Sequence, residues 1–190
     1  MKVARRLGIP GSPIWHSMLD AAEETLREEG YGALTSRRVA EPIGVKQRLV
    51  YYYFRTMEEL IVESFRRLAT REKERLANAL TSKSPLREIW DVCVHTSDTR
   101  LVSEFIALAN RIELLRTEVT DHIKECRRIQ VAALTKAIRR KGAAKSIPSV
   151  AIAIFATSAA LALHHEAGLG VRTGHAEVTA VIEKFIASLE

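Results

Sequence analysis

The sequence contains few of the residues that small secreted or metal-binding domains depend on. It has two cysteines, Cys93 and Cys126, which lie far apart in the chain. This count and separation support neither a disulfide framework nor a zinc knuckle. We expect both thiols to be reduced and buried, with redox sensing as the alternative if the two sulfur atoms meet in the fold.

Catalytic motifs are also missing. We find no glycine-rich phosphate loop, nucleophile elbow, paired acid motif or cysteine-histidine cluster at working spacing. His164 and His165 are adjacent, so on a helix they point about 100 degrees apart and cannot hold one ion together. We therefore predict no catalytic residue, no metal site and no cofactor. An enzyme with an all-helical pocket is an alternative without a supporting motif.

Long hydrophobic runs and low-complexity tracts are absent as well. The longest apolar run, residues 150–163, is shorter than the roughly 20 residues that span a bilayer. Residues 1–13 contain glycine and proline and lack the apolar stretch of a signal peptide. With 190 residues and 47% hydrophobic content, the chain is long and apolar enough for one or two globular domains. We expect a soluble cytoplasmic protein without a membrane partner.

Residues 35–57 have the pattern of two short helices joined by a turn at a glycine. Five apolar residues have the spacing that packs two such helices together: Val39, Ala40, Ile43, Val45 and Val50. The polar side chains left facing outward are Arg37, Arg38, Lys46, Gln47 and Arg48. Five basic residues and one acid, Glu41, lie between Ser36 and Arg55. This excess predicts a phosphate-binding surface, although a charge run by itself is also typical of a solvated face.

The segment resembles the TetR family of bacterial transcriptional regulators. The resemblance runs from Ile14 to Leu60, about a quarter of the chain. The matching residues are Leu19-Asp20-Ala21-Ala22, Gly30-Tyr31, Thr35, Val39-Ala40, Gly44-Val45, Tyr51-Tyr52-Tyr53-Phe54 and Glu58-Glu59-Leu60. The resemblance implies an all-α fold, in which a three-helix helix-turn-helix domain precedes a larger helical domain for ligand binding and dimerisation.

Ten residues are our predicted DNA contacts. We expect Thr35 and Ser36 to approach a phosphate at a helix N-terminus. Groove contacts are assigned to Lys46, Gln47, Arg48 and Tyr52. Backbone contacts or packing are assigned to Tyr51, Tyr53 and Arg55, and Arg37 completes the basic surface.

Three residues depart from the usual family pattern. Pro42 stands where a helix former is usual, and because proline removes a hydrogen bond we expect the helix after Thr35 to stop or kink near Glu41. Leu49 and Met57 stand where the family commonly contacts phosphate, which puts two contacts with the DNA backbone in doubt.

The rest of the chain reads as helical. Ser12 and Pro13 begin a helix that ends at Gly30. Thr56 and Glu59 form a capping box for a helix that reaches residue 79. Further helices are predicted at 86–97, 101–115, 118–141, 147–167 and 175–189. We therefore predict a flexible basic arm over 1–11, a DNA-binding domain over 12–57 and an effector domain over 58–190.

The last two helices are predicted to form a dimer interface. Residues 150–163 are apolar or small around the helix, and in the resembled family these two helices pair with their copies. A simple buried core helix is the alternative. The predicted interface consists of Phe155, Ala159, Leu163, Val178, Val181, Ile182, Phe185 and Ile186.

The resemblance also implies an effector pocket between the helices of the second domain. The candidate lining is Trp90, His95, Phe105, Asn110, Arg111, His122, Phe155 and Ser158, each of which can equally be core or surface. Basic residues also gather over 127–145, where cations at a helix C-terminus explain the charge more simply than a second nucleic-acid or membrane contact.

These features predict a homodimeric, ligand-responsive repressor that binds near-palindromic operator DNA and is released by an unknown small-molecule effector. A small-molecule binding protein with a degenerate helix-turn-helix is the alternative.

Overall fold

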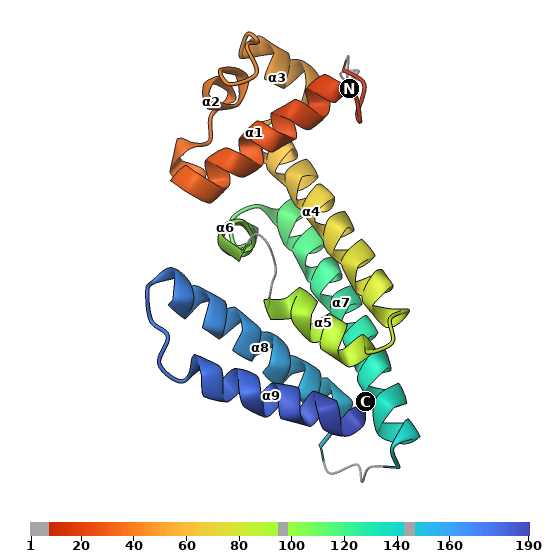
Figure 1. The fold of residues 1–190 in the computed structure, drawn as a ribbon. Helices are drawn as coiled ribbons and strands as arrows, with labels where there is room; N and C mark the ends of the chain where they lie inside the picture. Colours follow the sequence, from red (N-terminus) through yellow and green to blue (C-terminus); the bar gives the residue numbers. More distant parts are fainter. Residues whose placement is uncertain (1–7, 95–98, 143–146) are drawn as a thin grey trace. The chain divides into compact units, whose positions relative to one another are not determined.

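The computed structural model describes residues 8–94, 99–142 and 147–190. Over these residues the chain forms nine α-helices, one short 3-10 helix and no strand, which confirms the all-α prediction (Figure 1). The helices are α1 Pro13–Glu29, α2 Ser36–Ala40, α3 Arg48–Tyr53, α4 Met57–Leu80, α5 Pro85–Val94, α6 Thr99–Ala109, α7 Glu113–Arg140, α8 Ser149–Gly168 and α9 His175–Leu189, and the 3-10 helix is Tyr31–Ala33.

Contacts divide the chain into two compact units. The first unit contains residues up to 69 together with 100–120, and the second contains 70–99 and 121–190. The long helices α4 and α7 therefore each contribute residues to both units. The functional boundary after residue 57 stays a prediction.

The first unit has a core of large side chains from α1 to α4, α6 and the start of α7. Phe65 of α4 meets Phe105 of α6 edge to face, with ring centroids 5.4 Å apart. The side chains that are almost completely buried are Met18, Leu19, Leu26, Val39, Val50, Phe54, Leu60, Ile61, Val62, Leu101, Phe105 and Leu115.

The helix ends follow from local chemistry. Ser12 caps α1 by accepting a hydrogen bond from the Trp15 amide at 3.4 Å, and Pro13 occupies the first turn as predicted. Thr56 Oγ1 accepts from the Glu59 amide at 3.0 Å at the start of α4. The returning carboxylate of Glu59 accepts from the amide of Arg55 at 2.7 Å, one residue before Thr56.

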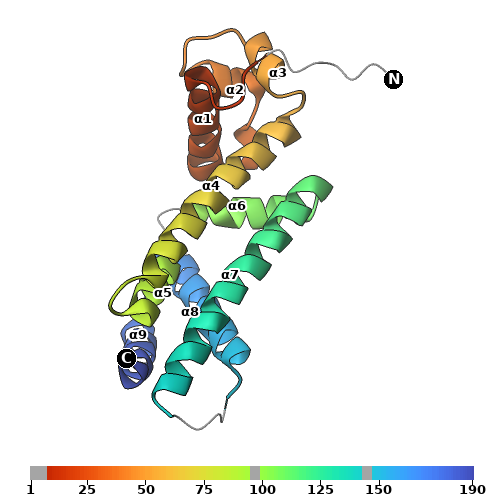
Figure 2. The same cartoon turned by 90° about the vertical axis from the view of Figure 1, so that its right-hand side faces the viewer.

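In the second unit, α8 and α9 lie antiparallel, side by side, and α5 packs on α8 (Figures 1 and 2). The carboxylate of Glu190, just past the end of α9, accepts a hydrogen bond from the Leu86 amide at 2.7 Å and so caps α5. The core residues of this unit are Leu86, Trp90, Leu134, Ala137, Ile138, Ala153, Ala160, Ile186 and Leu189.

One predicted helix boundary was wrong. The helix expected over 101–115 ends at Ala109, and α7 begins at Glu113 rather than at residue 118. The guanidinium of Arg116 donates to the carbonyls of Ala109 at 3.0 Å and Asn110 at 2.9 Å. It thereby satisfies carbonyls at the end of α6, where the sequence has no glycine or proline to mark a break.

The other boundaries differ less. The structure ends α5 at Val94, and residues 95–97 of the helix expected over 86–97 lie outside the described residues. The helix expected over 147–167 runs from Ser149 to Gly168, after Pro148.

Helix α8 is more extensive than the apolar run in the sequence suggested. Its 20 residues are long and apolar enough to cross a bilayer by length and composition, with a mean hydropathy of 1.4 over its most apolar window. Only 11% of that window is buried inside the chain, whereas the core helix of a soluble protein is mostly buried. The helix therefore presents an apolar surface to its surroundings.

Candidate nucleic-acid interface

Helix α2 is short because its sequence starts and stops it within a few residues. Thr35 Oγ1 accepts a hydrogen bond from the Arg38 amide at 3.1 Å, which caps the first turn. The helix ends at Ala40, two residues before Pro42, as the proline predicted. Val39 and Ala40 face the core, so the helix is held by one buried side.

The turn after α2 depends on Gly44. Its φ is +68°, in the left-handed region that other residues adopt only at a cost. The Gly44 amide donates to the Glu41 carbonyl at 3.1 Å, and the Val45 amide donates to the Ala40 carbonyl at 3.1 Å. These two bonds fix the direction in which the chain enters α3.

Helix α3 is anchored from behind. Val50 and Phe54 are 0% and 1% exposed, and the Phe54 ring stacks on Trp15 of α1 with centroids 6.0 Å apart. On the opposite side Tyr51 and Tyr52 are 50% and 41% exposed. A helix of six residues therefore has one buried face and one face available to a partner.

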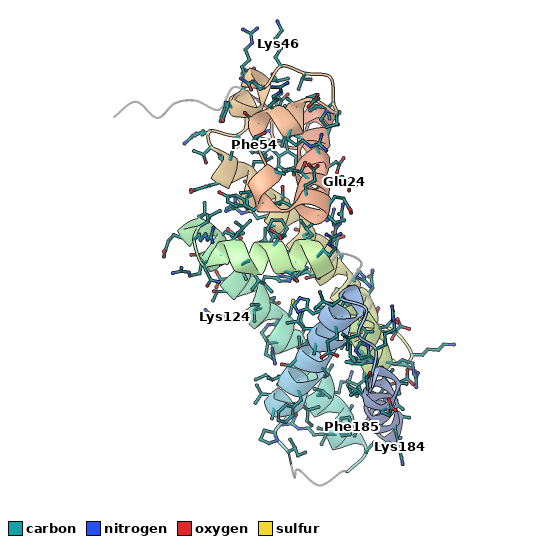
Figure 3. The ribbon with its side chains drawn as sticks, turned by 90° about the vertical axis from the view of Figure 1, so that its left-hand side faces the viewer. Glu24, Lys46, Phe54, Lys124, Lys184 and Phe185 are labelled. Carbon is teal, nitrogen blue, oxygen red and sulfur yellow. The ribbon has the colours of Figure 1, made fainter. Side chains whose placement is uncertain are left out.

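The exposed face carries the predicted contacts. Lys46, Gln47 and Arg48 are all exposed at the start of α3, and Figure 3 shows Lys46 extending away from the domain while Phe54 lies among its helices. Arg37 and Arg55 are exposed as well. Cationic, amide and phenol groups of this kind bind phosphates and base edges in a DNA groove.

The structure places two of the unusual residues in the interior. Leu49 and Met57 are half-buried and pack against the core of the first unit, which favours a packing role for both side chains. Tyr53 is likewise half-buried against that core, which favours packing over DNA contact. Arg38 is bound to Glu29 with its Nε 2.9 Å from the carboxylate, and this hydrogen bond raises the pKa of Arg38.

One contact beside α3 was not predicted from the sequence. The buried backbone of Gly8 lies flat on the Tyr53 ring, where an added Cβ would come within 2.4 Å of Cδ1. The Gly8 amide also points at the Tyr52 carbonyl at 3.4 Å. The signal in the sequence was the glycine itself. Residues 1–7 of the predicted arm lie outside the described residues.

Comparisons with known proteins identify this domain. Residues 18–63 match the family described as bacterial regulatory proteins, tetR family. The fatty acid metabolism regulator protein of Bacillus subtilis (strain 168) is 23% identical over 134 residues, which cover 67% of this chain and 69% of the relative. Residues 18–63 are therefore a TetR-family DNA-binding domain. The protein is accordingly a DNA-binding transcriptional regulator.

Solved structures extend the TetR-like fold over nearly the whole chain. A transcriptional regulator from Saccharomonospora viridis in complex with choline has a TM-score of 0.80 at 14% identity, over 91% of this chain and 95% of its own. A TetR transcription regulator from Haloarcula marismortui ATCC 43049 has a TM-score of 0.74 at 17% identity, over 93% and 95%. The second unit therefore shares the fold of TetR-family regulators.

The candidate effector residues are dispersed in this TetR fold. Phe105 is completely buried in the core of the first unit, and Asn110 and Arg111 are exposed in the turn before α7. Phe155 and Ser158 are exposed on α8. His122 is engaged with a carboxylate, Trp90 lines a cavity, and His95 lies outside the described residues.

The cavity that Trp90 lines lies between α5, α7, α8 and α9 in the second unit, with a volume of about 60 Å³. Its lining is almost entirely apolar. The sequence showed apolar residues at helical spacing in these helices, but it did not show which of them line a cavity. The lining residues are Leu86, Ile89, Trp90, Cys93, Gln130, Leu134, Ile152, Ala153, Ala156, Thr157, Ile182, Phe185 and Ile186.

Next to this cavity is a polar cluster on α4 and α7. His122 Nε2 lies 2.7 Å from the Glu72 carboxylate and 3.6 Å from Cys126 Sγ. Burial lowers the pKa of His122, but the hydrogen bonds and charges of Cys126 and Glu72 outweigh it and raise the pKa to about 9. Burial raises the pKa of the Cys93 thiol to about 11, so this thiol is a neutral group. Both cysteines are free and half-buried.

The predicted dimer residues of α8 and α9 differ in exposure, and Ile182, Phe185 and Ile186 among them line the cavity. Phe155 and Val181 are each 68% exposed, and Val178 and Phe185 are also exposed. Ala159, Leu163 and Ile182 are half-buried, whereas Ile186 is buried in the wall of the cavity. Figure 3 labels Phe185 and Lys184 on α9. The assignment of these residues to an interface stays a prediction.

Proposed function

We propose that the protein is a homodimeric repressor that binds a near-palindromic operator and is released by a small molecule. The observation that carries the proposal is the exposed face of α3, where Lys46, Gln47, Arg48 and Tyr52 project from a buried apolar base. Lysine, arginine and glutamine at the start of a recognition helix have the donors that read base edges in the major groove.

Dimerisation is supported by the apolar surface of α8 and α9. A soluble protein rarely leaves aromatic and branched side chains such as Phe155 and Val181 this exposed on one surface. A second copy, related by a twofold axis, would cover the same patch on both chains. Two α3 helices held in this way would reach half-sites one helical turn apart, about 34 Å.

Release by an effector requires only modest coupling. A ligand that favours one spacing of the two DNA-binding domains by about 1–3 kcal/mol changes operator affinity by about five- to 150-fold. Helix α4 follows α3 directly in the chain and contributes residues to both compact units, so it is the element that we propose transmits the change. The cytoplasm is the compartment in which such a regulator meets its operator.

Selection of bound fragments from random duplex DNA tests the proposal directly. We expect an inverted repeat to be recovered, because a twofold dimer reads two equal half-sites. The Arg48→Ala, Tyr52→Ala double variant should then lose affinity for the recovered duplex by at least tenfold while sedimenting as a dimer. Lys124→Ala removes an exposed cation of α7 and is the matched control.

A second candidate is a small-molecule binding protein whose helix-turn-helix no longer binds DNA. The interior positions of Leu49 and Met57 favour it, because they remove two places where TetR-family proteins commonly contact phosphate. The same selection separates the two functions. A dimer that enriches no sequence at physiological salt supports the second function and contradicts the first.

A further inference from the structure

The cavity in the second unit has a polar end. Gln130 of α7 is 7% exposed and lines the wall. Its Nε2 donates to Cys93 Sγ at 3.5 Å, and its Oε1 has only a long contact of 3.4 Å with Thr157 Oγ1. The Thr157 hydroxyl has a single proton and lies 2.7 Å from the Ala153 carbonyl. The Gln130 oxygen is therefore poorly satisfied in a nearly apolar surrounding.

An arginine with one unsatisfied nitrogen lies one helical turn away. Arg127 precedes Gln130 by three residues, so both side chains lie on one side of α7, about 4.5 Å apart along its axis. Nη1 of Arg127 is buried and has no hydrogen-bond partner among the described residues. An unpaired buried guanidinium nitrogen is costly, and a carboxylate is the group that best satisfies it.

Other charges in the neighbourhood leave it positive. Glu72 is engaged by His122, which its surroundings favour in the charged form. The charges of Glu72, Arg127 and Arg75 all act on Cys93, a residue of the cavity wall, so one anion and two cations lie near the cavity although none of the three is among its lining residues. No aspartate or glutamate lines the cavity that the structure describes, so a cationic ligand would find no counter-charge there.

We propose that the cavity binds an amphipathic monocarboxylate, with its hydrocarbon chain between Trp90, Leu134 and Ala156 and its carboxylate on Arg127. The inference rests on the proposed ligand-responsive function and names the chemical class of the effector. It distinguishes this chain from the Saccharomonospora viridis relative, whose structure contains the cation choline.

Tryptophan fluorescence provides the assay. The chain has two tryptophans, so the full-length Trp15→Phe protein reports from Trp90 alone, on the cavity wall. The cavity of about 60 Å³ is smaller than octanoate, so its walls must move apart to admit the chain. We expect saturable binding of octanoate, with affinity rising by at most about fourfold per CH₂ from butyrate to octanoate. Octan-1-ol and octyltrimethylammonium should bind at least tenfold more weakly than octanoate.

Variants test each end of the ligand. Arg127→Gln should weaken octanoate by roughly ten- to a hundredfold and leave octan-1-ol unchanged, and Arg127→Lys should retain part of the preference. Arg128→Gln is the matched control, because Arg128 is exposed and paired with Glu125 at 2.7 Å. Ala156→Leu should weaken both octanoate and octan-1-ol, whereas Ala132→Leu, exposed on α7, should not.

Three results overturn the inference: no binding of any octyl compound, equal affinity for octanoate and octan-1-ol, or an equal effect of Arg127→Gln and Arg128→Gln. Operator binding is measured separately on the protein that retains both tryptophans, because Trp15 supports α3 through Phe54. A protein that binds its operator but not octanoate contradicts the ligand class alone. A protein that binds octanoate but no DNA contradicts the proposed regulator instead.

Discussion

The contacts of His122 with Cys126 and Glu72 predict how the stability of the protein depends on pH. The pKa of His122 is raised from its ordinary value of 6.5 to about 9 in the folded chain. A raised pKa means that the folded protein holds the proton more tightly than the unfolded chain. The stabilisation is therefore complete below pH 6.5 and is lost as the pH rises through about 9.

The size of the effect follows from the same shift. At about 1.4 kcal/mol per pKa unit, the ceiling is about 3 kcal/mol between pH 6 and pH 10. The His122 side chain is 11% exposed and that of Glu72 is 21% exposed, so water reaches the pair in part. Solvent screening reduces the expected loss to about 1–2 kcal/mol.

Urea unfolding followed by circular dichroism measures this loss, at one protein concentration and at intervals from pH 6 to pH 10. His122→Gln and Glu72→Gln should each flatten the curve relative to the parent. His16→Gln, which changes an exposed histidine of α1, should leave the parent's pH dependence intact. Parallel curves for the parent and His122→Gln would show that the pair does not hold an extra proton in the fold.

Two further substitutions test packing and assembly. Gly8→Ala should destabilise the amino-terminal domain by about 1–3 kcal/mol, because the added Cβ would come within 2.4 Å of the Tyr53 ring. Gly32→Ala is the control, because Gly32 has open space around it. Equal melting temperatures for the two variants would contradict this packing. Val181→Asp should convert the dimer to monomer in analytical ultracentrifugation, because it places a charge where the 68% exposed valine is proposed to meet the second copy. Ile123→Asp on α7 is the control. An unchanged dimer in Val181→Asp would exclude this surface.

The helix-turn-helix could be predicted in detail because its determinants are local. Thr35 caps α2 by accepting a hydrogen bond from an amide three residues away, and Pro42 ends the helix. Gly44 adopts the left-handed conformation that no other residue in the segment adopts. The family resemblance added the partner, double-stranded DNA, and the outward positions of α3. What the sequence left open was the role of Leu49 and Met57, and only packing showed that both face the core.

The effector end of the molecule was far less predictable. Apolar residues at helical spacing mark buried faces, but the same spacing occurs beside a cavity and beside a filled core. Phe105 was therefore a reasonable ligand candidate and is instead a core residue. Nothing in the sequence distinguished cavity residues such as Gln130 and Ala156 from other residues of the same helices.

The sequence by itself determined the helices with their caps and the identity of the DNA-binding domain, because these depend on residues within a turn or two of one another. Only the folded structure showed the break after Ala109, the pairing of His122 with Glu72, the contact of Gly8 with Tyr53 and the unsatisfied nitrogen of Arg127. The break is local, because Arg116 folds back on the carbonyls before it. The other three features arise where residues from different segments meet, and only packing determines which segments come together.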